Sequence, residues 1–218
     1  MKHGGFTLVE LLIALVLTSL LAVLVSGGLR IATQTWHSLY GRSDALQEAL
    51  LAEQFLRELL AGSNDMRLRS DDSRTLQVVM YGDQQQLIFL APQPRQLGPL
   101  GTPTWCQLAL LDTEDGPALT LTLLPMDTEE NRISWPDLEE RLRQEGRQLV
   151  LTRAVQGLQF DYYRVRDRQG DWRPQWQGEN QLPELIRIQF QVAEENRLFW
   201  PALSIQPQGK AYGLKSPS

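Results

Sequence analysis

The first thirty residues constrain this chain more than any other part of it. From Leu11 to Leu29 no residue is charged, which gives an uncharged run of 19 residues. As a helix this run spans about 28 Å at a rise of ~1.5 Å per residue. That length is close to the ~30 Å thickness of the hydrocarbon core of a bilayer. The run therefore predicts one membrane-spanning helix near the N-terminus.

The order of the N-terminal parts differs from that of an ordinary secretory signal. Such a signal places basic residues first, then an apolar stretch, and then a cleavage site of small residues. Here a short polar leader, Met1 to Gly5, comes directly before the apolar segment, and no clear small-x-small site follows it. We therefore expect the apolar segment to remain in the mature chain.

Glu10 stands at the entrance of the apolar run. A carboxylate there is costly in lipid unless it is paired, which makes it a functional candidate. In one interpretation, Glu10 lies among the lipid head groups and sets the depth of the helix. In the other, it neutralises a cation from another subunit, and a chain cut after Gly5 would supply that cation as the free amine of Phe6. Glu10 alone does not separate these interpretations.

The segment Gly5-Phe6-Thr7-Leu8-Val9-Glu10 and the apolar run after it resemble the class III signal of type IV prepilins and type II secretion pseudopilins. The resemblance implies cleavage between Gly5 and Phe6 by a membrane prepilin peptidase, followed by N-methylation of Phe6. It also implies that Glu10 takes the inter-subunit role. The expected location is the bacterial inner membrane, crossed once, with a head domain in the periplasm.

A second helical pattern follows at residues 44–61, and Gly62 is a plausible helix stop. Apolar residues recur there at spacings of three and four, which is typical of one buried helix face. This stripe consists of Leu46, Ala49, Leu50, Ala52, Leu56, Leu59 and Leu60. Glu53 interrupts the stripe, and Arg57 lies one turn further on, where the two side chains can pair.

After Gly62 the residue pattern changes from one typical of a helix to one typical of β-strands. Residues 75–80 and 86–90 predict one hairpin around Tyr81-Gly82-Asp83, and residues 105–111 and 118–124 predict another. Residues 93–104 predict a loop, Ser134 is expected to cap a short helix, and a last strand is expected at residues 198–205. The clearest strand is 185–192, in which apolar residues alternate with polar ones.

These patterns and the resemblance predict an α+β, pilin-like fold. A long N-terminal helix, whose first half spans the membrane, is expected to pack on an antiparallel β head. The expected parts are a leader at residues 1–5, the helix at 6–62, the head at 63–207 and a flexible tail at 208–218.

The C-terminal third carries a more specific resemblance. Gly170-Asp171-Trp172, Trp176 and the segment 182–188 resemble the C-terminal half of the protein J family of minor pseudopilins in type II secretion. That family has a tryptophan-bearing turn followed by a Leu-Pro entry into an amphipathic strand. A hairpin with two core tryptophans explains the same residues equally well on physical grounds.

The protein J resemblance implies a place in a filament-tip complex that primes pseudopilus assembly for export across the outer membrane. The implied partners are two other minor pseudopilins, proteins I and K, together with the major pseudopilin and the prepilin peptidase. Minor type IV pilins of the PilW kind, which serve pilus assembly, adhesion or DNA uptake, share the general plan and are the alternative.

Composition argues against several other classes. One cysteine allows no intrachain disulfide, and the two histidines form no zinc-binding cluster with it. Once the leader is lost only His37 remains, close to the membrane, so a Ser-His-Asp arrangement is not expected. The net charge of −5 provides no basic surplus for nucleic acid. We predict no catalytic residues, no cofactor, no metal and no nucleic-acid partner.

The remaining charged or reactive residues are expected to be structural. Acidic clusters at 112–115 and 127–130 do not match a calcium-binding EF-hand loop, so solvated turns are the favoured interpretation over calcium sites. Cys106 lies in an apolar strand and is expected to pack as a small hydrophobe. Surface charge is the expected role of the arginines 141, 143, 147, 153, 164, 166 and 168.

A first prediction concerns the leader. Gly5→Leu should block processing because a bulky side chain then stands at the cleavage position, and the full-length precursor should accumulate in the membrane. Gly5→Ala is the matched control and should be processed. Intact-mass measurement of the membrane-extracted chain distinguishes the two forms, and normal processing of Gly5→Leu would contradict the predicted site.

Overall fold

The computed structural model describes residue 17 and residues 49–71, 75–93, 102–127, 129–192 and 200–209. The chain divides into two compact units, Met1–Leu46 and Gln47–Ser218. All described residues except Leu17 belong to the second unit, which is the head. The predicted leader and, apart from Leu17, the predicted membrane-spanning segment lie outside the described residues. In the described part of the chain, no helix is both long and apolar enough to cross a membrane.

Residues 49–61 are helical, and one side of this helix is buried in the head. The predicted stripe is confirmed at five positions: Ala49, Ala52, Leu56, Leu59 and Leu60 are buried. Its assignment of Leu50 was wrong, since this side chain is 58% exposed. Position 50 lies about 100° around the helix from Ala49, on the side away from the core. The expected pair forms between Arg57 and Glu53 at 2.9 Å.

The helix ends where the sequence predicts. The backbone N–H of Gly62 donates to the carbonyl of Glu58 at 3.1 Å, and the Ser63 hydroxyl donates to the carbonyl of Leu60 at 2.7 Å. These bonds satisfy carbonyls that a helix end leaves without partners. Gln208, near the end of the described chain, donates its backbone N–H to the carbonyl of Ala61 at 3.2 Å.

A five-stranded antiparallel sheet forms the centre of the head, in the order β3-β4-β5-β6-β8. Its strands are β3 (Met80–Gly82), β4 (Gln86–Pro92), β5 (Pro103–Thr113), β6 (Gly116–Pro125) and β8 (Arg147–Thr152). The predicted β5–β6 hairpin is confirmed, with Trp105 opposite Leu124 and Thr113 opposite Gly116. Gly116 has φ of +106°, a conformation that favours glycine at this turn. Strand β8 was not predicted from the sequence.

The first predicted hairpin needs two corrections. Tyr81 and Gly82 belong to β3 rather than to the turn, which begins at Asp83. The Asp83 carboxylate accepts the backbone N–H groups of Gln85 and Gln86 at 2.7 and 2.9 Å, which fixes the turn locally. Residues 75–80 are also not one strand, because Val79 separates β2 (Leu76–Val78) from β3 and the two strands join different sheets.

A four-stranded antiparallel sheet has the order β10-β9-β11-β12. Its strands are β9 (Val155–Arg166), β10 (Gln169–Arg173), β11 (Leu185–Val192) and β12 (Leu203–Ile205). The prediction of β11 is confirmed at both ends. The segment 170–172 is a strand rather than a turn, and the last strand begins after Pro201, which lies outside it.

A small third sheet and one short helix complete the described head. The sheet joins β1 (Arg67–Ser70), β2 and β7 (Arg132–Ile133) in the order β2-β1-β7, with β1 and β7 parallel. Helix α2 (Trp135–Glu145) begins after Ser134 as predicted, but no side-chain hydrogen bond caps it. The antiparallel head of the predicted fold is thereby confirmed in its main sheets.

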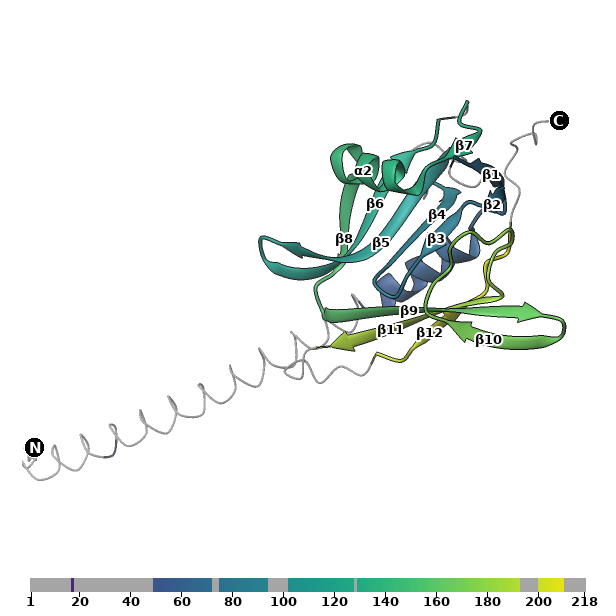
Figure 1. Cartoon of the computed structure of the whole chain (residues 1–218). Helices are drawn as coiled ribbons and strands as arrows, with labels where there is room; N and C mark the ends of the chain where they lie inside the picture. Colours follow the sequence, from purple (N-terminus) through teal and green to yellow (C-terminus); the bar gives the residue numbers. More distant parts are fainter. Residues whose placement is uncertain are drawn as a thin grey trace, which may run out of the picture. The chain divides into compact units, whose positions relative to one another are not determined.

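Each side of the five-stranded sheet is covered by a separate apolar cluster. On one side, residues of β3 to β6 pack with the helical residues 49–61 and with the inner face of the four-stranded sheet. On the other side, Ile88, Leu90 and Trp105 pack with Leu138 and Leu142 of α2. Figure 1 shows α2 over one side of the sheet and the blue helix and strands β9, β11 and β12 toward the other.

A close contact at Gly82 joins the two larger sheets. The hydroxyl of the fully buried Tyr162 on β9 donates to the carbonyl of Asp83 at 2.9 Å. Gly82 and Trp176 exchange two backbone hydrogen bonds, at 3.0 and 2.8 Å. A Cβ at position 82 would lie 2.1 Å from the Tyr162 hydroxyl oxygen, so only glycine leaves room for this contact.

This contact predicts coupled effects on stability. Gly82→Ala should destabilise the head by about 1–3 kcal/mol through overpacking, and Tyr162→Phe by about 1 kcal/mol through the lost hydrogen bond. Because the phenylalanine removes the atom that the new Cβ would meet first, the double variant should lose less than the sum of the single losses. Urea unfolding of the full chain in detergent, followed by tryptophan fluorescence, measures this; strict additivity would refute the contact.

Candidate functional site

The site residues predicted from the sequence, Gly5, Phe6 and Glu10, lie outside the described residues. The other candidate was the tryptophan-bearing segment, and the structure places it in β10 and in the stretch that leads to β11. The candidate surface of the head is therefore the one that surrounds this segment.

Strands β9, β10 and β11 give the four-stranded sheet two different faces. Phe160 and Tyr162 of β9 and Ile186 and Ile188 of β11 point into the core. Since side chains alternate along a strand, their neighbours in sequence lie on the opposite face. We define the outer face by its members Asp161, Tyr163, Val165, Trp172, Leu185, Arg187 and Gln189.

Trp172 is the most prominent aromatic side chain of the outer face, and it is 40% exposed. Its ring lies 5.1 Å from that of Tyr163, directly across on β9, and the guanidinium carbon of Arg187 lies 4.0 Å from its centroid. Trp176, in contrast, is fully buried and donates its indole N–H to the carbonyl of Gln181 at 3.1 Å. The interpretation of two core tryptophans was therefore right for Trp176 and wrong for Trp172.

Asp161 holds Arg187 beneath the Trp172 ring. Its Oδ2 atom accepts hydrogen bonds from Nε and Nη2 of Arg187 at 3.2 and 2.9 Å, and from Nε2 of Gln189 at 3.2 Å. The Asp161 side chain is only 12% exposed, so this charge depends on its partners. A cation over an aromatic face contributes about 0.5–1 kcal/mol at an exposed site. The outer face therefore holds its exposed tryptophan in one place.

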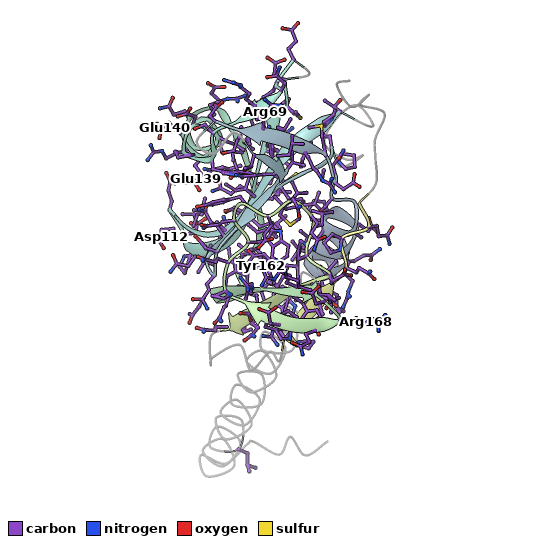
Figure 2. The ribbon with its side chains drawn as sticks, turned by 45° about the vertical axis from the view of Figure 1, so that its right-hand side comes forward. Arg69, Asp112, Glu139, Glu140, Tyr162 and Arg168 are labelled. Atoms are coloured by element: carbon purple, nitrogen blue, oxygen red, sulfur yellow. The ribbon has the colours of Figure 1, made fainter. Side chains whose placement is uncertain are left out.

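The turn between β9 and β10 is tight and strained. Arg166 faces Gln169 across the hairpin, so only Asp167 and Arg168 connect the strands. Both have positive φ, at 52° and 66°. Two-residue turns with two positive φ values match the twist of a hairpin, but they favour Asn and Gly over Arg. Figure 2 places Arg168 at the margin of the head, whereas Tyr162 lies inside it.

Most of the arginines that were expected to act as surface charge form ion pairs with carboxylates of the head. Arg141 meets Glu130 at 2.8 Å and Arg153 meets Asp115 at 3.2 Å, while Arg143 pairs with Glu140. Arg164 lies 3.3 Å from Glu179, and Asp171 lies near both Arg164 and Arg173. Arg166 and Arg168 take part in no ion pair among the described residues.

The remaining candidates from the sequence have structural roles. Cys106 is fully buried in β5, and burial raises the pKa of its thiol far above the ordinary value, which keeps it protonated. In the acidic clusters, Asp115 and Glu130 form ion pairs, and Asp127 accepts the backbone N–H of Glu129 at 3.0 Å. The described residues contain no group of three or more metal-binding side chains.

A polar chain links α2 to the central sheet. Gln107 donates to Gln86 at 2.7 Å, and Gln86 donates to the carboxylate of Glu139 at 3.1 Å. Burial raises the pKa of Glu139; the hydrogen bond from Gln86 opposes this shift, and the negative charge of Asp83 adds to it. Burial, followed by the charges of Glu139 and Asp83, also raises the pKa of Tyr81. Glu139 is thus a half-buried carboxyl group whose pKa lies above its ordinary value.

Sequence reasoning missed the Asp161–Arg187 pair. The alternation of β11 placed Arg187 on the polar face, and Asp161 stands between the apolar residues Phe160 and Tyr162. The two residues become direct cross-strand partners only when β9 pairs with β11 in the observed register. That register comes from the tertiary fold and has no local sequence signal.

Comparisons with known proteins cover both ends of the chain. Residues 117–199 match the family described as "Type II secretion system (T2SS), protein J", and residues 1–26 match the "Prokaryotic N-terminal methylation motif". A relative named "Type II secretion system protein J", from Xanthomonas campestris pv. campestris, is 27% identical over 200 residues, which covers 86% of each chain.

The match over residues 1–26 shows an N-terminal methylation motif, as the class III signal predicted. Residues 117–199 match the protein J domain of the type II secretion system, whose family consists of structural pseudopilins. The resemblance drawn from Gly170-Asp171-Trp172, Trp176 and the segment 182–188 is confirmed, since all of them lie in the matched segment.

The polar chain at Glu139 predicts a pH dependence of stability. The folded chain holds the Glu139 proton more tightly than the unfolded chain does, so this group lowers the free energy of unfolding as pH rises from the ordinary Glu pKa through the raised one. Glu139→Gln should flatten that fall, which begins near the ordinary Glu pKa of about 4. Urea unfolding across this range measures it.

Glu145→Gln, which changes an exposed carboxylate at the end of the same helix, is the matched control and should keep the wild-type curve. Identical pH profiles for Glu139→Gln and the wild-type chain would contradict the proposed protonation of Glu139.

Proposed function

We propose that this chain is the J-type subunit of a filament-tip complex that primes pseudopilus assembly in type II secretion. The observation that carries the proposal is the protein J match over residues 117–199, which includes β9, β10 and β11. The similarity to the Xanthomonas protein J extends over most of both chains. Both findings favour a secretion system over the alternative of a minor type IV pilin.

In the proposed assembly, the partners are the minor pseudopilins I and K and the major pseudopilin. One side of the helical residues 49–61 is part of the main core of the head. The predicted N-terminal helix, residues 6–62, would anchor the chain in the inner membrane with a single span and leave the head in the periplasm.

Processing is proposed to occur between Gly5 and Phe6, with N-methylation of Phe6 by the prepilin peptidase. Support comes from the methylation motif, whose match covers residues 1–26. Glu10 is then proposed to pair with the Phe6 amine of a neighbouring subunit. In lipid an unpaired carboxylate is costly, so this pair should contribute more than an ion pair at a water-exposed surface.

The proposed role is structural, without catalysis, cofactor or nucleic-acid binding. The family to which the head domain belongs consists of structural pseudopilins rather than enzymes. The polar side chains of the outer face bond to one another: Arg187 and Gln189 donate three hydrogen bonds to the Asp161 carboxylate.

The N-terminus provides the test of this proposal. Mass spectrometry of the chain purified from its native membrane should find a mature form that begins with N-methylated Phe6. Glu10→Ala should be processed normally but should assemble poorly, because the amine of the neighbouring subunit loses its partner. Secretion of the native cargo should fall accordingly.

Glu10→Asp, which retains the charge, serves as the matched control and should retain more assembly than Glu10→Ala. An intact Met1 would sink the processing proposal, and full secretion after deletion of the whole chain would sink the proposed function.

A further inference from the structure

The last described residues, 200–209, reach the end of the helical residues 49–61, and we call them the C-terminal clasp. The backbone N–H of Gln208 donates to the carbonyl of Ala61 at 3.2 Å. The last four carbonyls of a helix, Ala61 among them, have no partner within the helix. A remote part of the chain thus supplies the missing donor. Figure 1 shows the yellow segment after β12 passing the end of the blue helix.

Apolar side chains hold the clasp in the core. Leu203 and Ile205 of β12 are at most 5% exposed, and they belong to the same apolar cluster as Leu56 and Leu60 of the helix. Strand β12 lies at the edge of the four-stranded sheet and pairs with β11 over only three residues. The clasp therefore joins the helix end to this sheet through a short pairing at the sheet's edge.

Two features make closure of the clasp costly. The indole N–H of Trp200 is buried, and no acceptor meets it within the described part of the chain. A buried donor without a partner has lost its hydration without compensation. Gly209 must be fixed at φ of +59°, and ordering the backbone costs more entropy for glycine than for any other residue. Opening would return water to the Trp200 N–H and freedom to Gly209, so both features favour the open clasp.

We propose that the C-terminal clasp opens while the rest of the head stays folded, and that its opening releases the end of the helical residues 49–61. An open clasp removes the Gln208 donor and the apolar contacts of Leu203 and Ile205 from the helix side of the core. Strands β5 and β6 keep their ten-residue pairing, and α2 keeps its contact with the other side of the central sheet. Terminal and edge elements open at a lower free energy than central strands.

The clasp follows the segment 117–199 that matches the protein J family, so its role is argued from this chain's own contacts. It belongs to the head alone and does not depend on the proposed function.

Hydrogen exchange of the full chain in detergent micelles, followed by mass spectrometry, tests the clasp. Gln208→Pro removes the donated N–H, so the amides of the helical residues 49–61 should exchange about fivefold faster, as expected for the loss of one hydrogen bond. Peptides from β5 and β6 should keep the wild-type rate. Gln208→Ala, which retains the backbone N–H, is the matched control and should leave the helix unchanged.

A pair of glycine variants tests the clasp through a second contact. Gly209→Val places a Cβ 3.3 Å from the Asp65 side chain and strains the backbone, so it should also speed exchange in the helix. Gly178→Val is the matched control, because Gly178 has a similar φ of +68° but its Cβ would meet nothing within 4 Å. Its effect should stay near position 178 and leave the helix at the wild-type rate.

The exchange pattern decides the outcome. Faster exchange in the helix with unchanged β5 and β6 would support the clasp. Wild-type exchange of the helix in both Gln208→Pro and Gly209→Val would show that the clasp does not hold the helix. An equal rise in the helix, β5 and β6 would show that the head opens only as a whole. Either of these two results would overturn the proposal, and neither bears on secretion, which deletion of the chain tests separately.

Discussion

The apolar layer shared by the helical residues 49–61 and the two larger sheets holds the head together. Leu56 and Leu60 are at most 1% exposed, and full burial of a leucine contributes about 1.5–3 kcal/mol. The same layer receives Phe160 and Ile188 from the four-stranded sheet. The helical residues 49–61 therefore link the two larger sheets through one shared apolar layer.

The contact at Gly82 explains how the second sheet keeps its position on that layer. The Tyr162 hydroxyl reaches the backbone of the β3–β4 turn, and the Trp176 backbone pairs with Gly82 itself. Tyr162 lies within β9, and Trp176 lies in the segment between β10 and β11, so the sheet is held at the strands that build the outer face. The position of Trp172 on the surface thus follows from bonds made deep inside the head.

Sequence reasoning succeeded where the signal is local and failed where the signal is tertiary. The alternation in β11, the spacing of Ala52, Leu56 and Leu59, and the stop at Gly62 each follow from a short-range period or cap. Leu50 was misplaced because a leucine-rich helix contains more apolar residues than one buried face can accept. Trp172 was misplaced for a related reason: its burial depends on which strand pairs with β9, and no short pattern in the chain encodes that pairing.

The two tryptophans of the protein J segment show why composition alone could not separate core from surface. Trp176 is buried, and its polar group is satisfied there because its indole N–H donates to the carbonyl of Gln181. Its ring packs 6.3 Å from the ring of Tyr162. Trp172 contacts a cation and a second aromatic ring on the solvent side of the sheet. These contacts, together with the nearly buried Asp161 that binds Arg187, order a tryptophan that remains 40% exposed. Composition counts both residues as large apolar side chains, whereas their burial is set by the face of the sheet on which each one lies.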